Sequence, residues 1–222
     1  MLRYPAATMM IHPMYHHVRP PYRPPQAPVF DPLPAAFYAR DALVVAEELL
    51  GAEIVVADVR VAITEVEAYR AGGDTANHAR MGRTPRNAPM WGPPGHAYVY
   101  LCYGLHRMLN VVTDTDGVAS AVLVRGARCI EGEATFRQRR PDGRADGPGR
   151  VGVALGLELA SSGTPLFGGG PLVIHPRRTV PSVLAGPRVG IDYATPEHRE
   201  APWRLADAAF PPRVDRRRLL LP

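Results

Sequence analysis

Proline is concentrated at the N-terminal end of this chain, and its distribution is the feature that most constrains the fold. Nine of the 25 prolines lie within the first 34 residues. Proline fixes φ and lacks an N–H donor, so neither a helix nor a strand can run through a segment this rich in it. We therefore predict a disordered or polyproline-like leader over residues 1–34, a folded domain over residues 35–215 and a basic C-terminal tail over residues 216–222.

The length and composition of the rest are those of one globular domain. A chain of this size buries about 70% of its unfolded surface. The formal charge of +5 and the isoelectric point of about 9.5 fit a polyanionic partner, although many basic proteins never bind nucleic acid. Cys102 and Cys129 form no Cys-x-x-Cys pair, so neither a disulfide framework nor a metal site is indicated. No apolar run approaches the ~20 residues of a membrane span, and no signal peptide is recognisable, so we expect a cytoplasmic protein without membrane contact.

Apolar periodicity predicts several short elements that are separated by turn residues. Residues 41–50 are expected to form a helix, with Asp41 at its N-cap and Gly51 as its stop signal. Strands are expected over residues 54–56, 59–66, 97–102, 107–112, 120–125 and 188–191, and further helices over residues 130–140 and 151–157.

Two other stretches bear on function. Residues 70–94 are rich in Gly, Pro, Asn and Arg, which predicts a long ordered loop, and long loops in compact domains are usually functional. Residues 147–152 match the glycine fingerprint of dinucleotide-binding proteins. They follow the polar residues 141–146 instead of an apolar strand, so we interpret them as a turn that leads into a helix.

The window from residue 67 to residue 110 combines a carboxylate, an imidazole and several tyrosines, the groups needed to flip a base and direct water at its sugar. In order, spacing and residue type it resembles the alkyladenine (3-methyladenine) DNA glycosylase family. The resemblance covers about residues 35–205. It rests on Glu67-Ala68-Tyr69, His78, Arg83-Thr84-Pro85-Arg86-Asn87, Met90, Tyr98-Val99-Tyr100, Tyr103-Gly104, Asn110, Ala121 to Ala127, Glu131-Gly132, Gly147-Pro148 and Pro202-Trp203-Arg204.

The resemblance implies both a fold and an activity. The fold would be α+β, a single mixed domain with a curved, mainly antiparallel β-sheet and peripheral helices, similar to the C-terminal domain of formyltransferases. The activity would be excision of alkylated or deaminated purines from double-stranded DNA in base excision repair. The substrates would be 3-methyladenine, 7-methylguanine, hypoxanthine and ethenoadenine, and the enzyme would act as a monomer without a metal or cofactor, associated with the nucleoid if bacterial.

The basic residues restrict the chemistry further. The chain has no lysine, so all 26 basic residues are arginine. A glycosylase that also cleaves the strand uses an amine that forms a Schiff base, and here only the N-terminus supplies one. We therefore expect a monofunctional enzyme that uses water and leaves an abasic site.

Glu67 is the candidate general base. It ends a strand and enters the long loop, and it matches the glutamate that activates water in the family. From spacing alone, a solvated glutamate at a strand end would be the commoner explanation. Glu65 lies on the same face but corresponds to no functional residue of the family. Arg125 ends another strand and matches the arginine that helps to place the water and the target phosphate.

The resemblance places Tyr69, His78 and Tyr100 around the flipped base. Alkylation makes the base cationic, and a cation over an aromatic face gains about 0.5–2 kcal/mol. Core packing is the alternative for the two tyrosines, and a surface position for the histidine. Asn110 corresponds to an asparagine of the family that disfavours normal guanine by crowding its amino group.

The remaining candidates would contact the duplex. Alternation along the strand places Tyr103 on a hairpin tip beside Gly104, where it resembles the wedge that fills the gap left by the flipped base. The alternative is a tyrosine folded back onto its hairpin. Arg83 and Arg86 flank a proline in the loop and are candidates for backbone phosphate contacts, or for surface ion pairs.

Three positions depart from the family pattern. His106 stands where some members have tyrosine, Arg150 replaces a lysine, and residues 205–207 lack the usual aromatic strand. These departures leave one rival, a catalytically inactive nucleic-acid-binding module of the same fold. A zinc deaminase is discarded, because no Pro-Cys-x-x-Cys is present.

Overall fold

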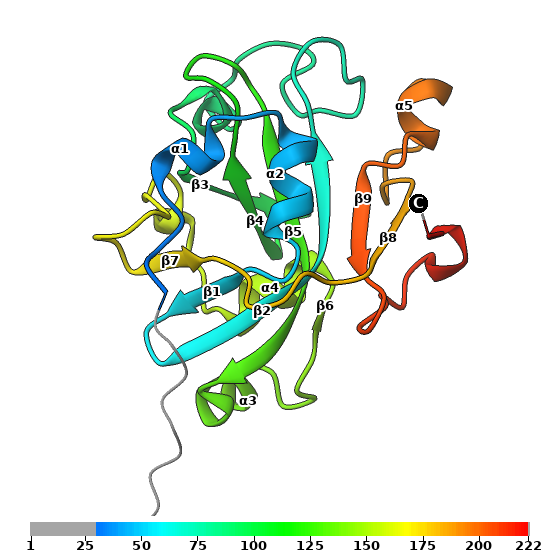
Figure 1. Cartoon of the computed structure of the whole chain (residues 1–222). Coiled ribbons are helices and arrows are strands. Elements are labelled where there is room, and N and C mark those ends of the chain that lie inside the picture. Colours follow the sequence, from blue (N-terminus) through cyan, green and yellow to red (C-terminus); the bar gives the residue numbers. More distant parts are fainter. Residues whose placement is uncertain (1–29, 222) are drawn as a thin grey trace, which may run out of the picture.

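A curled antiparallel sheet forms the body of the molecule, and short helices lie around it (Figure 1). The computed structural model describes residues 30–221, so most of the proposed leader lies outside it. The strands are β1 (Glu53–Val56), β2 (Val59–Tyr69), β3 (Ala97–Cys102), β4 (His106–Val112), β5 (Ala121–Glu131), β6 (Ala145–Asp146), β7 (Leu172–His175), β8 (Val183–Gly186) and β9 (Arg204–Asp207). The α-helices are α1 (Ala35–Tyr38), α2 (Ala42–Leu49), α3 (Glu133–Arg139), α4 (Pro148–Ala154) and α5 (Pro196–Glu200), and the 3-10 turns are Ala88–Trp91, Leu159–Ser161 and Arg216–Arg218.

The strand order is β3-β4-β5-β2-β1-β7, with β6 beside β5 and with β9 joining β2 to β8. Every strand pair among residues 30–221 is antiparallel. The predicted α+β class with a curved antiparallel sheet is therefore confirmed, while the likeness to the formyltransferase domain stays a prediction.

β2 is the central strand, and it changes phase in its middle. Val61 and Ile63 face the core, and so do Val66 and Ala68, although a regular strand would alternate without a break. The shift coincides with an irregular register against β5 around Glu65. A bulge inserts one unpaired residue and turns the following side chains to the other face. As a result, the polar residues beyond the bulge face away from the core.

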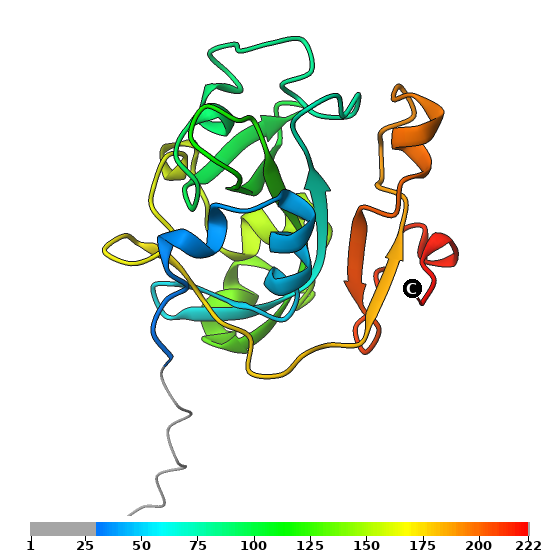
Figure 2. The same cartoon turned by 45° about the horizontal axis from the view of Figure 1, so that its top comes forward.

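The helix over residues 42–49 forms as expected and packs its apolar face onto the sheet. The side chain of Asp41 accepts a hydrogen bond from the Leu43 N–H at 2.9 Å, which satisfies one free donor of the first turn. Val45 and Leu49 are fully buried in the main core. In Figures 1 and 2, α2 lies across the sheet close to β2 and β5.

Several predicted boundaries need correction. The strand expected over residues 188–191 is wrong, because the pairing segment is β8 and the chain after Pro187 turns away to make side-chain contacts. The strand expected at 120–125 continues to residue 131. The helix expected from residue 130 therefore begins only after Gly132, whose φ of 76° ends the strand. The glycine-rich motif does lead into a helix, α4, which begins at residue 148.

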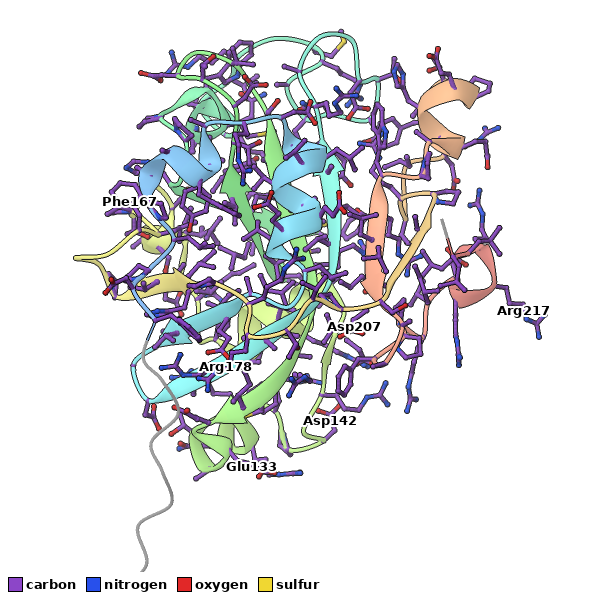
Figure 3. All side chains as sticks on the ribbon, in the orientation of Figure 1. Glu133, Asp142, Phe167, Arg178, Asp207 and Arg217 are labelled. Atoms are coloured by element: carbon purple, nitrogen blue, oxygen red, sulfur yellow. The ribbon has the colours of Figure 1, made fainter. Side chains whose placement is uncertain are left out.

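Packed structure extends past both ends of the proposed domain. Leu33 is 8% exposed and joins the main core, and its N–H donates to the Ile174 carbonyl at 2.8 Å. At the other end Leu220 pairs with Ala185 of β8, so the C-terminal residues lie beside β8 and β9 (Figure 2). Arg217 extends from this segment into solvent (Figure 3). No helix within residues 30–221 is long and apolar enough to cross a membrane.

Candidate active site

Glu67 is fully buried near the end of β2, and three donors surround its carboxylate. The Tyr69 phenol donates to Oε2 at 2.8 Å, and the Val189 N–H donates to Oε1 at 2.7 Å. The Nε of Arg125 lies 3.2 Å from the same Oε1. A carboxylate held in this way has one orientation, which a general base or a charge stabiliser requires.

Arg125 on β5 joins this carboxylate to a second one. Its Nε lies 3.0 Å from Oε1 of Glu65, and Nε of Arg204 lies 2.7 Å from the same oxygen. Burial by itself lowers the pKa of Arg125, but the charges of Glu67 and Glu65 outweigh it and raise the pKa above its usual value. Within residues 30–221 only Nε of Arg125 is hydrogen-bonded, so its terminal nitrogens can serve a ligand. Glu65 shares the face of Glu67, as expected, and it holds Arg125 in place.

Tyr69, His78 and Tyr100 form one aromatic group beside this carboxylate. The rings of Tyr69 and His78 are stacked at 6.4 Å, and those of His78 and Tyr100 meet edge to face at 4.7 Å. Although His78 is accessible from the cleft, desolvation of its ring and then the charges of Arg86 and Arg80 lower its pKa. The imidazole is therefore neutral at pH 7. Burial and then the charge of Glu67 raise the pKa of Tyr69 well above its usual value, so its phenol remains a donor.

A cleft of about 560 Å³ opens beside these rings. Its lining includes Tyr69, His78, Arg86, Tyr100, Tyr103 and Arg125. Glu67 lies behind two of them, Tyr69 and Arg125, so the structure brings together most of the residues singled out in the sequence. A second cavity, of about 450 Å³ and lined by Arg70, Trp91 and Gly117 among others, contains none of these residues.

Asn110 and the two loop arginines differ in their distance from this cleft. Asn110 is buried in a small hollow with Tyr69, His78 and Tyr100, and its amide donates to the Tyr98 carbonyl at 3.1 Å. Arg86 lies at the rim, where its guanidinium donates to the Leu101 carbonyl at 2.9 Å and faces the Tyr100 ring. Arg83 is exposed and does not line the cleft.

Tyr103 stands at the tip of the β3–β4 hairpin and is 91% exposed, so its ring is not folded back onto the strands. The Leu105 N–H donates to the Cys102 carbonyl at 3.0 Å, which closes the turn. The two central residues, Tyr103 and Gly104, have φ of 51° and 71°. Two positive φ angles are typical of the tight turn whose twist matches a hairpin, but this conformation is unfavourable for a tyrosine. The turn therefore displays an aromatic ring beside the cleft at some conformational cost.

Sequence patterns missed the contribution of the C-terminal segment. Val189 supplies a donor to Glu67, and Tyr193 lines the cleft and donates from its phenol to the Ala76 carbonyl at 2.9 Å. Arg188 forms a buried ion pair with Asp74. A backbone N–H has no residue-type signature, and these partners lie more than 110 residues apart in the chain, so spacing could not have found them.

Across residues 30–221 no group of three His, Cys, Asp or Glu side chains is arranged to hold a metal ion.

Comparison with known proteins identifies the family of the chain. The methylpurine-DNA glycosylase (MPG) family profile matches residues 36–210. A protein of Nitrosococcus oceani named putative 3-methyladenine DNA glycosylase is 54% identical over 180 residues, covering 79% of this chain and 90% of its own. A DNA-3-methyladenine glycosylase of Arabidopsis thaliana is 49% identical over 185 residues, covering 81% and 72%. A putative 3-methyladenine DNA glycosylase of Methanocella arvoryzae is 42% identical, covering 81% and 94%.

These matches define a DNA-repair hydrolase that acts on N-glycosyl bonds. More particularly, the chain belongs to the methylpurine-DNA glycosylase family.

Proposed function

We propose that this protein is a monofunctional DNA glycosylase that excises 3-methyladenine and related purines from double-stranded DNA. The related substrates are 7-methylguanine, hypoxanthine and ethenoadenine. It acts in the cytoplasm as a monomer, without a metal or cofactor. Its relatives carry the name 3-methyladenine DNA glycosylase over most of their length, which supports the first of these substrates.

The observation that carries the proposal is the position of Glu67. Its carboxylate is fixed by Tyr69 and Val189 at the back of a cleft whose volume lies within the range of small-molecule sites. Arg125 lies against the same carboxylate, and within residues 30–221 its terminal nitrogens have no hydrogen-bond partner. Glu67 orients the water that attacks C1′, and Arg125 helps to place this water and the target phosphate.

The aromatic group receives the flipped base. Tyr69 and Tyr100 offer ring faces to an alkylated, cationic purine, a contact worth about 0.5–2 kcal/mol. The neutral His78 imidazole has one donor and one acceptor with which to bind the base edge. Asn110, at the bottom of the group, crowds the amino group of normal guanine.

Tyr103 enters the duplex and replaces the flipped base in the stack. Its exposed ring on a tight, hydrogen-bonded turn fits this role, because a preformed wedge loses little conformational entropy on binding. Arg86 at the rim and the exposed Arg83 contact backbone phosphates, which positions the duplex without reading its sequence.

The absence of lysine in the chain supports release of the base by water alone. Single-turnover assays on a duplex with one ethenoadenine or hypoxanthine, without metal and with excess enzyme, test this. We expect release of the base and an unbroken abasic strand. Glu67→Gln should lower the rate by at least about 100-fold while duplex affinity persists.

A suitable control is Glu53→Gln. Glu53 is buried on β1 and bonded to Arg60 and Arg178, so its substitution removes a comparable charge away from the cleft. Its rate should match wild type when the protein is folded. Tight duplex binding by wild type without any release would favour the rival, the inactive nucleic-acid-binding module.

A further inference from the structure

Arg188 lies beside the site but touches neither the cleft nor Glu67. Its side chain is fully buried, and its guanidinium pairs in a bidentate manner with Asp74 at 2.6 and 2.8 Å. The same group donates to the Ala68 carbonyl at 2.9 Å, one residue after Glu67. Arg188 therefore ties the C-terminal segment to the end of β2 and to the start of the long loop.

Two aromatic rings enclose the same guanidinium. Its central carbon lies 4.7 Å from the Tyr69 ring centre and 4.9 Å from the Trp203 ring centre. The ring of Tyr69 is thus supported from one side by Arg188, while its phenol bonds Glu67. A planar guanidinium suits this geometry, since it can stack on rings and bond a carboxylate with two nitrogens at once.

The next residue in the chain makes the link to the carboxylate. The Val189 N–H donates to Oε1 of Glu67 at 2.7 Å. Because Arg188 is fixed on four sides, the peptide group that follows it is fixed as well. Tyr69 and Val189, two of the donors that orient Glu67, thus depend on the position of one buried side chain.

A contribution to stability alone explains this arrangement poorly. Buried ion pairs often add little net stability over apolar residues of similar volume. In addition, Nε of Arg188 has no hydrogen-bond partner in the described part of the chain. The contacts of Arg188 therefore fix the positions of the groups around it more clearly than they stabilise the folded protein.

We propose that Arg188, with Asp74, is a positioning residue that orients Glu67 through the Val189 N–H and the Tyr69 ring. The proposal rests on the proposed function of Glu67. A shift of the carboxylate by about 1 Å would misdirect the attacking water, while the duplex, which contacts other residues, would still bind.

The test uses Arg188→Lys with Arg178→Lys as the matched control. Arg178 also pairs with a carboxylate, that of Glu53, through two nitrogens, and it does not line the cleft. For both variants we would measure the single-turnover rate, the affinity for a duplex with an uncleavable abasic analogue, and amide exchange at Val189. Arg188→Lys should lose about 10- to 100-fold in rate and expose the Val189 amide to exchange, with affinity unchanged. Arg178→Lys should resemble wild type in all three.

A second variant distinguishes a loss of positioning from a loss of folding. The double substitution Asp74→Asn/Arg188→Met removes both charges together, so no buried charge is left unpaired, and the side-chain oxygen at position 74 can still accept from the Ala76 N–H. It should fold and still lose rate. Normal rates and a protected Val189 amide in either Arg188 variant would overturn the proposal, as would a loss of rate matched by an equal loss of affinity. If wild type released no base at all, the proposed function would fail, whereas Val189 exchange would still report on the positioning.

Discussion

Glu65 and Glu67 share one guanidinium nitrogen: their Oε1 atoms lie 3.0 and 3.2 Å from Nε of Arg125. Arg204 completes the group through its bond to Glu65. Two buried carboxylates therefore face two buried arginines, and the charges balance. Removing either carboxylate leaves a surplus positive charge out of contact with water.

Glu65→Gln should consequently be costly, even though Glu65 has no direct part in the reaction. Breaking a buried pair costs about 3–5 kcal/mol of unfolding free energy, which corresponds to a fall in Tm of roughly 6–20 °C in a protein of this size. Thermal unfolding followed by circular dichroism measures it. Glu48→Gln, which breaks the surface pair with Arg40, is the control and should cost less than about 1 kcal/mol. Equal losses in both variants would contradict the proposed burial of the group.

Tyr103→Ala should separate base flipping from stability. The side chain is 91% exposed, so its loss should change Tm by only a few degrees, about the effect of 1 kcal/mol. Base flipping, followed by fluorescence of 2-aminopurine beside the lesion, should be strongly reduced. Leu105→Ala on the same turn, also exposed, is the control. If both variants flipped the base as well as wild type, Tyr103 would not be the wedge.

Arg86→Ala should raise the pKa of His78. The positive charge of Arg86 disfavours a protonated imidazole, so its removal stabilises the charged form and moves the pKa toward its ordinary value. NMR titration of the histidine ring protons measures the change. Arg83→Ala, also in the loop, should leave this pKa unchanged. A fall in the pKa of His78 in Arg86→Ala would contradict this prediction.

The two kinds of substrate should differ in their dependence on pH. A cationic nucleobase such as 7-methylguanine leaves without further protonation, so its excision rate should not fall at higher pH. Hypoxanthine is neutral and needs a proton to leave, so its rate should fall at higher pH. Single-turnover rates across the pH range would show the difference. The same bell-shaped dependence of rate on pH for both substrates would contradict this prediction.

The sequence predicted the local elements well, because their signals are local. The N-cap Asp41 and the stop at Gly51 define α2, and the hairpin turn at Tyr103 and Gly104 has the expected position. The phase shift in β2 is also visible in the sequence, since the adjacent polar residues Thr64 and Glu65 interrupt the alternation of apolar residues. A bulge could have been inferred at that point.

The rest of the site depends on contacts that no local pattern encodes. The branched apolar residues after Arg188 predict a strand. In the folded protein this segment does not pair with a strand. Instead, the Arg188 guanidinium donates to Asp74 and the Val189 N–H donates to Glu67. In the sequence, Glu65 has the same residue type and strand face as Glu67. The register of β2, β5 and β9 places Glu65 beside Arg125 and Arg204, and both arginines bond its carboxylate.

The arrangement of the final strands has a consequence for synthesis on the ribosome. β2 is made early, but Arg204 and the Val189 N–H follow more than 120 residues later. Until they emerge, Glu65 lacks its bond from Arg204 and Glu67 lacks its bond from the Val189 N–H, which leaves Arg125 as their counter-charge among the contacts of residues 30–221. A nascent chain cannot hold the Glu67 carboxylate in its final orientation before the C-terminal segment docks, so under the proposed function it cannot release a base until that segment is in place.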